Sequence, residues 1–432
     1  MKKFLKFNAL VAVGFVSIFG MSVQAVPVTD STKNCKPLID VNKKPPTVTI
    51  QGLPERVHKR MNRALEMMGE DRYPEAIEQF KKLLETARSD FVKASVSLNL
   101  AYAVTQSGDS NGSLPYFKDA LKYGETSLPH ERVQSLRQNV AALMYGIGEK
   151  KQALAMMNTW LKNAVQHDAN AYYMIAALYA EDNKITEAMC PSYWSVKASS
   201  EPKKNYYQAL LAFHWEKKDV NGAIALLREM IEFFPQEKTY WRQLSQIYFQ
   251  KDKIDDAIAI MEMFYLKGDF DKETDYKMMS SMFAYRDIPF RAAKILEEGL
   301  KKGVVKSEKK NWVNVAQNYH VSNELDKAIV AYGKTAELSD SGTEFLKQAE
   351  ILSDEERYKE AISAFDKALR KGGLDKDEEG RVYFRKGTAL VNMGSCDAGI
   401  GALEEAQKFK RYRSQAGQWI NFAKERKRNN KC

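Results

Sequence analysis

The chain has 432 residues and a formal net charge of +10, and 44% of its residues are hydrophobic. So small a charge on so long a chain gives no reason to expect nucleic-acid binding, which requires concentrated basic patches. No stretch beyond residue 25 is long and apolar enough to span a bilayer, which takes about 20 residues.

Residues 1–25 are predicted to be a cleaved secretory signal peptide. Lys2, Lys3 and Lys6 form a positive region, residues 9–23 are mainly apolar, and the segment ends in a small residue. This order is typical of an export signal. Its removal lowers the formal charge from +10 to +7. No cysteine sits at the cleavage point, so we expect no lipid anchor, and the expected location is a bacterial periplasm.

Residues 26–54 follow the signal peptide and differ from the rest of the chain. They are polar, contain several prolines and show no helical periodicity. We therefore expect an extended segment rather than part of the folded stack.

A helix-turn-helix repeat is expected over residues 55–410. In "YWRQLSQIYFQKDKIDDAIAIMEMFY", Trp241, Leu244, Tyr248 and Ala257 have the spacing of a tetratricopeptide repeat, a unit of about 34 residues. A small residue recurs early in each predicted second helix, at intervals of 33 to 40 residues: Ala76, Ser113, Ala153, Ala188, Ala223, Ala257, Ala292, Ala328, Ala361 and Gly399.

A small side chain at this position lets two paired helices approach closely. The fold class predicted from this pattern is all-α, a right-handed superhelical solenoid of about ten such units. Each unit is too small to bury its own apolar face, so neighbouring units must stabilise one another. Residues 411–432 contain Ala416, Trp419, Ile420 and Ala423 at helical spacing, and they are expected to form a capping helix and tail.

The four cysteines are an even number in an oxidising compartment, which favours two disulfides. The last second helix begins near Cys396, and the capping helix returns by about the same distance, about 1.5 Å per residue. Cys432 should therefore lie beside Cys396. Cys35 lies on the extended segment and is expected to pair with Cys190. Two free thiols or a bond between chains are the alternatives for this second pair.

Residues with catalytic or metal-binding chemistry do not gather in motifs. The methionines at repeat core positions are interpreted as core filling, because a flexible thioether fills gaps well. Cys190-Pro191 resembles a haem-regulatory dipeptide, and "DFDKETD", residues 269–275, lacks the glycine of a calcium loop. The histidines are scattered, without the spacing of metal ligands: His58, His130, His167, His214 and His320. We expect no enzyme, no metal, no cofactor and no small-molecule substrate.

Function is expected on the first helices, because these line the concave side of tetratricopeptide arrays and bind peptides or partner helices there. An aromatic residue beside amides and a cation is typical of a protein-binding surface. The alternative for each residue is that it covers the neighbouring unit. The candidate partner-binding residues are Asn205, Gln208, Trp215, Arg242, Gln246, Phe249, Lys277, Ser281, Tyr285, Gln317 and His320.

Basic residues concentrate near the C-terminal end of the sequence. The simplest interpretation is a solvated terminal helix. The alternative is contact with an anionic partner, either lipid head groups at a membrane surface or an acidic protein. The residues are Lys408, Lys410, Arg411, Arg413, Lys424, Arg426, Lys427, Arg428 and Lys431.

Several stretches resemble one family more closely than the repeat alone does. They are the run of residues 233–305, which includes "IPFRAAKILEEGLKKGVV", and the later "AELSDSGTEF", "ALRKGGL" and "QAGQWINFAKE". Over residues 55–425 the chain resembles the periplasmic tetratricopeptide proteins encoded with TonB energy-transduction systems of gammaproteobacteria. Residues 26–54 and the cysteine pattern lie outside this resemblance.

The resemblance implies an accessory protein that works beside TonB, ExbB and ExbD. These proteins use the proton gradient to drive uptake of iron chelates or other scarce nutrients through outer-membrane receptors. The implied role is a scaffold or adaptor without catalytic residues. The alternatives are a scaffold for outer-membrane or cell-wall assembly, and a carrier of metal or haem that uses methionines or Cys190.

Overall fold

The computed structural model describes residues 29–49 and 51–432. The predicted signal peptide lies outside the described residues. Within them, the regular secondary structure consists of 21 α-helices, which confirms the all-α fold. Neighbouring helices pack in antiparallel pairs of the tetratricopeptide type, and the chain divides into two compact units, one ending at Gln236 and the other beginning at Glu237.

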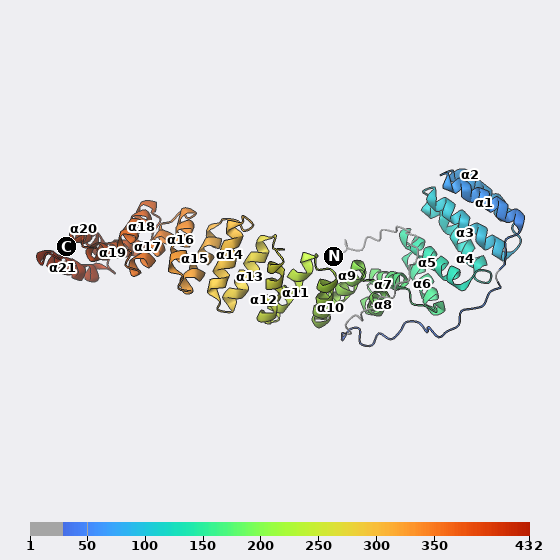
Figure 1. Ribbon diagram of the computed structural model, residues 1–432, viewed down its shortest axis with the longest axis horizontal. Coiled ribbons are helices and arrows are strands. Elements are labelled where there is room, and N and C mark those ends of the chain that lie inside the picture. The colour runs from blue at the N-terminus through green and yellow to red at the C-terminus, as the bar shows by residue number, and fades with distance from the viewer. Residues whose placement is uncertain (1–28, 50) are drawn as a thin grey trace. The chain divides into compact units, whose positions relative to one another are not determined.

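Unit 1 contains five helix pairs, and consecutive helices lie against one another in chain order (Figure 1). Its first helix begins where the sequence predicts the repeats to start. The helices are α1 Glu55–Gly69, α2 Tyr73–Glu85, α3 Asp90–Gln106, α4 Ser110–Gly124, α5 His130–Gly146, α6 Lys150–Asn163, α7 Ala169–Glu181, α8 Ile185–Lys197, α9 Lys204–Glu216 and α10 Val220–Phe233.

Unit 2 contains five further pairs and one additional helix, α21, which packs against α20. This last helix occupies the place of the predicted cap. The helices are α11 Lys238–Gln250, α12 Ile254–Leu266, α13 Glu273–Tyr285, α14 Pro289–Lys301, α15 Lys309–Val321, α16 Leu325–Glu337, α17 Thr343–Asp354, α18 Tyr358–Lys371, α19 Lys376–Asn392, α20 Cys396–Gln407 and α21 Arg413–Arg428.

The recurring small residue is the fourth residue of every second helix, from Ala76 in α2 to Gly399 in α20. Each of these ten residues is buried. At Gly399 a Cβ atom would lie 2.6 Å from Val391 Cγ2, so the approach of α19 and α20 admits no side chain there. The sequence spacing therefore identified the contact that sets the distance between paired helices.

The turn inside each pair also has a constant geometry. The residue two positions before every second helix has a positive φ. Glycine supplies it at Gly108, Gly148 and Gly394, Asp or Asn supplies it in five other pairs, as at Asp287 with φ 54°, and Lys218 and Glu356 supply it in the remaining two. Asp and Asn tolerate this region better than most residues, so the turn persists without glycine.

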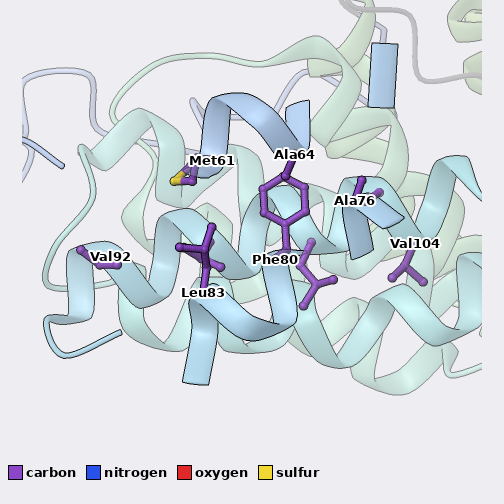
Figure 2. Packing of buried hydrophobic residues seen from close by; sticks show 10 residues of the cluster. Met61, Ala64, Ala76, Phe80, Leu83, Val92 and Val104 are labelled. Carbon is purple, nitrogen blue, oxygen red and sulfur yellow. The ribbon is translucent and has the colours of Figure 1, made fainter. Parts of the chain in front are cut away.

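The apolar faces of the helices are buried between neighbouring helices in both units. Figure 2 shows the first part of this packing, where Phe80 of α2 packs among residues of α1 and α3 such as Met61 and Val104. The methionines at repeat core positions are buried, with Met157, Met230 and Met261 fully inaccessible, which confirms their interpretation as core filling. Among the described residues, no helix is long and apolar enough to cross a membrane.

Residues 29–49 form an N-terminal strap that lies on unit 1. The strap contains a turn at 30–34 and no helix or strand. A disulfide joins Cys35 to Cys190 of α8, with a Cα–Cα distance of 5.1 Å. Next to it, Trp194 Nε1 donates a hydrogen bond to the carbonyl oxygen of Lys36 at 2.9 Å.

Two further contacts show the direction of the strap. Ser31 Oγ donates to Asp219 Oδ2 at 2.6 Å, beside the start of α10. Lys43 Nζ donates to the carbonyl oxygen of Lys162 at 2.8 Å, near the end of α6. The strap therefore passes α10, α8 and α6 in that order, opposite to the order of the repeats, before the chain enters α1.

Candidate protein-binding surface

The predicted partner-binding residues divide between the two units. Asn205, Gln208 and Trp215 lie on α9 of unit 1, and the other eight lie on α11, α13 and α15 of unit 2. On α9 the three side chains are exposed, and the Trp215 side chain has an exposed fraction of 36%.

In unit 2, three polar residues occupy the same position of successive first helices. Gln246, Ser281 and Gln317 are each the ninth residue of α11, α13 and α15, and all three are exposed. Equal positions in stacked repeats place these side chains in one row. We call this row, together with the exposed residues Tyr285, His320 and Val321 at the ends of α13 and α15, the first-helix face. Its amide and hydroxyl groups can donate and accept hydrogen bonds.

Apolar residues lie at the C-terminal ends of the same helices. The rings of Phe249 and Tyr285 meet edge to face with 5.9 Å between centroids, which links α11 to α13. Tyr285 is 63% exposed and Val321, at the end of α15, is 78% exposed. His320 is exposed beside Val321, with its ring 6.4 Å from that of Tyr332. A partner can therefore bury apolar surface at this end of the row.

Val321 was not among the residues predicted from the sequence. Like Tyr285, it is the last residue of a first helix, 36 residues further along the chain. The repeat register contained this signal, but an aliphatic residue inside a helical pattern reads as core unless its position relative to the helix end is known.

The predicted cation Arg242 forms ion pairs inside the stack. Its guanidinium lies 2.7 and 2.9 Å from the two carboxylate oxygens of Asp275, a fully buried residue of α13, and it also contacts Asp271. The hydrogen bond to Asp275 holds the pKa of Arg242 above its usual range. A hydrogen bond from Lys238 holds the pKa of Asp271 below its usual range. These acids belong to the "DFDKETD" stretch, and their partners are cationic side chains of α11.

The second predicted cation, Lys277, forms an ion pair with Glu273 one turn earlier on α13. This pair lowers the pKa of Glu273. Both cations thus have acidic partners within unit 2. The part of the first-helix face that remains for a partner is formed by neutral polar groups and by the exposed apolar residues at its end.

A separate pocket of about 710 Å³ lies between the strap and unit 1. The strap contributes Pro45, Pro46 and Val48, and the opposite wall includes His130 and His167. No group of three or more His, Cys, Asp or Glu side chains suited to a metal ion occurs within residues 29–49 and 51–432. The lining is mixed and open, and it brings together no set of residues with an identifiable chemistry.

Comparison with known proteins finds similarity in fold to solved structures. No family model and no curated protein matches the sequence. A tetratricopeptide repeat protein from Parabacteroides merdae has a TM-score of 0.37 and 14% identity, over 61% of this chain and 99% of that one. MamA from Desulfovibrio magneticus RS-1 has a TM-score of 0.33 and 16% identity, over 42% of this chain and 98% of that one. YrrB, described as a tetratricopeptide protein with an unusual peptide-binding site, has a TM-score of 0.33 and 16% identity, over 43% of this chain and 91% of that one.

Proposed function

We propose that this protein is a periplasmic scaffold that binds protein components of a TonB-dependent uptake system for iron chelates or other scarce nutrients. The observation that carries the scaffold role is the first-helix face of unit 2. Gln246, Ser281 and Gln317 form an exposed row of hydrogen-bonding groups there, and exposed apolar residues adjoin it. Apolar anchors beside neutral polar groups suit protein recognition better than they suit catalysis.

The periplasmic location is supported by the predicted signal peptide and by the two cysteine pairs, since disulfides persist in oxidising compartments. The assignment to a TonB system is supported by the sequence resemblance over residues 55–425. In that setting, TonB, ExbB and ExbD are the first partners to test.

Growth on a scarce iron chelate tests this proposal. Deletion of the gene should abolish or strongly slow growth that depends on TonB and leave growth on abundant iron unchanged. Normal growth of the deletion strain under every such limitation would refute the role in uptake.

Complementation with variants links the phenotype to the surface. Ser281→Arg combined with Gln317→Arg places two cations in the row and should fail to restore growth. The matched control is Ala259→Arg with Val330→Arg, which adds the same charge at exposed positions of the second helices α12 and α16. This control should restore growth. Equal growth with both double variants would show that the first-helix face does not bind the partner.

A further inference from the structure

The last part of the chain combines high positive charge with an ordered structure. Residues 424–431 contain five cations and one acid, and they contain no apolar residue. The helix α21 continues through this segment to Arg428. The apolar contacts of α21 end earlier, because its buried residues are Ala416, Ile420 and Ala423.

Polar and covalent contacts hold this basic segment in place. The disulfide between Cys396 and Cys432 has a Cα–Cα distance of 5.7 Å and ties the residue that follows the segment to the start of α20. Lys427 forms an ion pair with Asp397. Arg426 Nη2 donates to the carbonyl oxygen of Lys431 at 3.0 Å. The segment therefore presents its charges from a fixed position.

Three of the five cations point to solvent. Lys424, Arg428 and Lys431 are exposed and form no ion pair with the described residues. Cations in the last turn of a helix interact favourably with the helix dipole. That effect falls off within one turn, so it does not account for Lys424 or for Lys431, which lies beyond the helix.

An exposed aromatic residue lies on the same helix, one turn before Arg426. Phe422 is 45% exposed, although it lies on a helix whose other face is packed. Its ring meets that of Trp419 edge to face at 5.5 Å, and the Arg426 guanidinium lies 5.8 Å from its centroid. Aromatic rings next to cations are favoured at the boundary between lipid head groups and acyl chains.

We propose that this surface, formed by Lys424, Arg428, Lys431 and Phe422, binds an anionic phospholipid membrane. Lys424 and Arg428 are four residues apart and share one flank of α21, Phe422 and Arg426 share the other flank, and Lys431 follows the helix. Cations thus lie around the exposed side of the helix end, an arrangement that suits a fluid layer of phosphate groups. An acidic protein would instead have to match fixed positions on a convex helix. The proposal is independent of the first-helix face, which belongs to α11, α13 and α15.

Co-sedimentation of the full chain with vesicles tests this proposal. The oxidised protein should bind vesicles that contain about one third phosphatidylglycerol, and binding to pure phosphatidylcholine should be weak. Each cation near an anionic surface contributes about fivefold to partitioning. The triple variant Lys424→Gln, Arg428→Gln and Lys431→Gln should therefore partition on the order of 100-fold less.

The matched control is Lys251→Gln, Lys294→Gln and Lys359→Gln, which removes the same charge from exposed positions elsewhere in unit 2. It should bind vesicles like the unchanged protein. Equal binding by the two triple variants would show that net charge alone drives adsorption and would overturn the proposal. Retention on immobilised polyglutamate without any vesicle binding would assign the surface to an acidic protein and would also overturn it.

Two single variants test the other parts of the surface, the disulfide that holds the cations in place and the aromatic ring. Cys432→Ser leaves the cations in place but releases the segment, so partitioning should fall several-fold; unchanged partitioning would refute the role of the disulfide. Phe422→Ser should weaken the part of the binding that persists at high salt, because salt screens the cations and not the ring. Retention of salt-resistant binding in this variant would remove Phe422 from the proposed surface.

Discussion

The two units share one repeat geometry but are reinforced by different means. Unit 1 carries the N-terminal strap, whose disulfide closes a separation of 155 residues. Unit 2 has no strap. Its own disulfide closes a separation of only 36 residues at the last helices, and arginines join its successive repeats. We call these contacts the arginine pairs: Arg242–Asp275, Arg286–Asp255, Arg291–Glu262, Arg357–Asp326, Arg385–Asp354 and Arg411–Asp377.

The strap disulfide and the arginine pairs differ in how much stability they add beyond repeat packing. A disulfide that closes a loop of this length can contribute up to about 5 kcal/mol by restricting the unfolded chain. Exposed ion pairs contribute about 0–1 kcal/mol each, and five of the six arginine pairs have an aspartate or glutamate that is 31% exposed or more. The pair of Arg242 with the buried Asp275 is the exception.

The largest effect is expected from removal of the strap disulfide. Cys35→Ser with Cys190→Ser should lower the free energy of unfolding of unit 1 by about 3–5 kcal/mol. Hydrogen exchange in graded denaturant resolves the amides of α7–α10 from those of α15–α18, because repeat stacks can unfold in parts. Unit 2 should be unchanged, and an equal loss in both units would contradict the separate reinforcement of unit 1.

Within unit 2, the buried arginine pair should exceed the exposed ones. Arg242→Met leaves Asp275 buried without its guanidinium partner and should destabilise α11–α14 by about 3 kcal/mol. Arg286→Met is the matched control, since it removes an exposed pair, and it should cost less than about 1 kcal/mol. Urea unfolding of both variants compares the two costs. Similar costs would mean that burial does not distinguish these pairs.

The close-packed small residue should matter equally in both units. Ala223→Leu in α10 and Ala257→Leu in α12 force additional atoms between paired helices and should each destabilise their unit by about 1–3 kcal/mol. Ala259→Leu, at an exposed position of α12, should change stability by less than about 0.5 kcal/mol. An unchanged urea midpoint for either buried substitution would mean that the paired helices are not packed equally closely in the two units.

The smallest expected effect is a pH dependence of unit 1. Burial lowers the pKa of His214, and the hydrogen bond to Asp219 opposes this shift; burial also lowers the pKa of His167. Because the unfolded chain then binds protons more readily, unit 1 should lose stability as the pH falls below about 6.5 toward the folded-state pKa. His214→Gln should reduce this dependence in hydrogen exchange at pH about 7.5 and about 5.5. Greater stability at the lower pH would reverse the predicted sign.

Much of the fold follows from one spacing in the sequence. The interval between small residues predicts ten helix pairs, and the structure places each of these residues fourth in its second helix. Helix lengths also indicate how Cys396 and Cys432 come together, because two antiparallel helices of known rise return the chain to its starting level.

Other features depend on contacts that the sequence does not encode locally. Arg242 reads as an exposed cation until its distance to Asp275, 33 residues away, is known. The division after Gln236 has no strong marker in a continuous run of repeats. The path of the strap depends on single contacts such as that of Ser31 with Asp219, which follow no periodicity.

Crosslinking in cells tests most directly whether the first-helix face of unit 2 binds a protein. A photoreactive amino acid placed at Ser281 should form a covalent adduct with a component of the TonB system, identified by mass spectrometry. The same amino acid at Ala259, exposed on α12, should form none. Equal adducts from both positions, or none from Ser281 in cells that depend on TonB uptake, would contradict binding at this face.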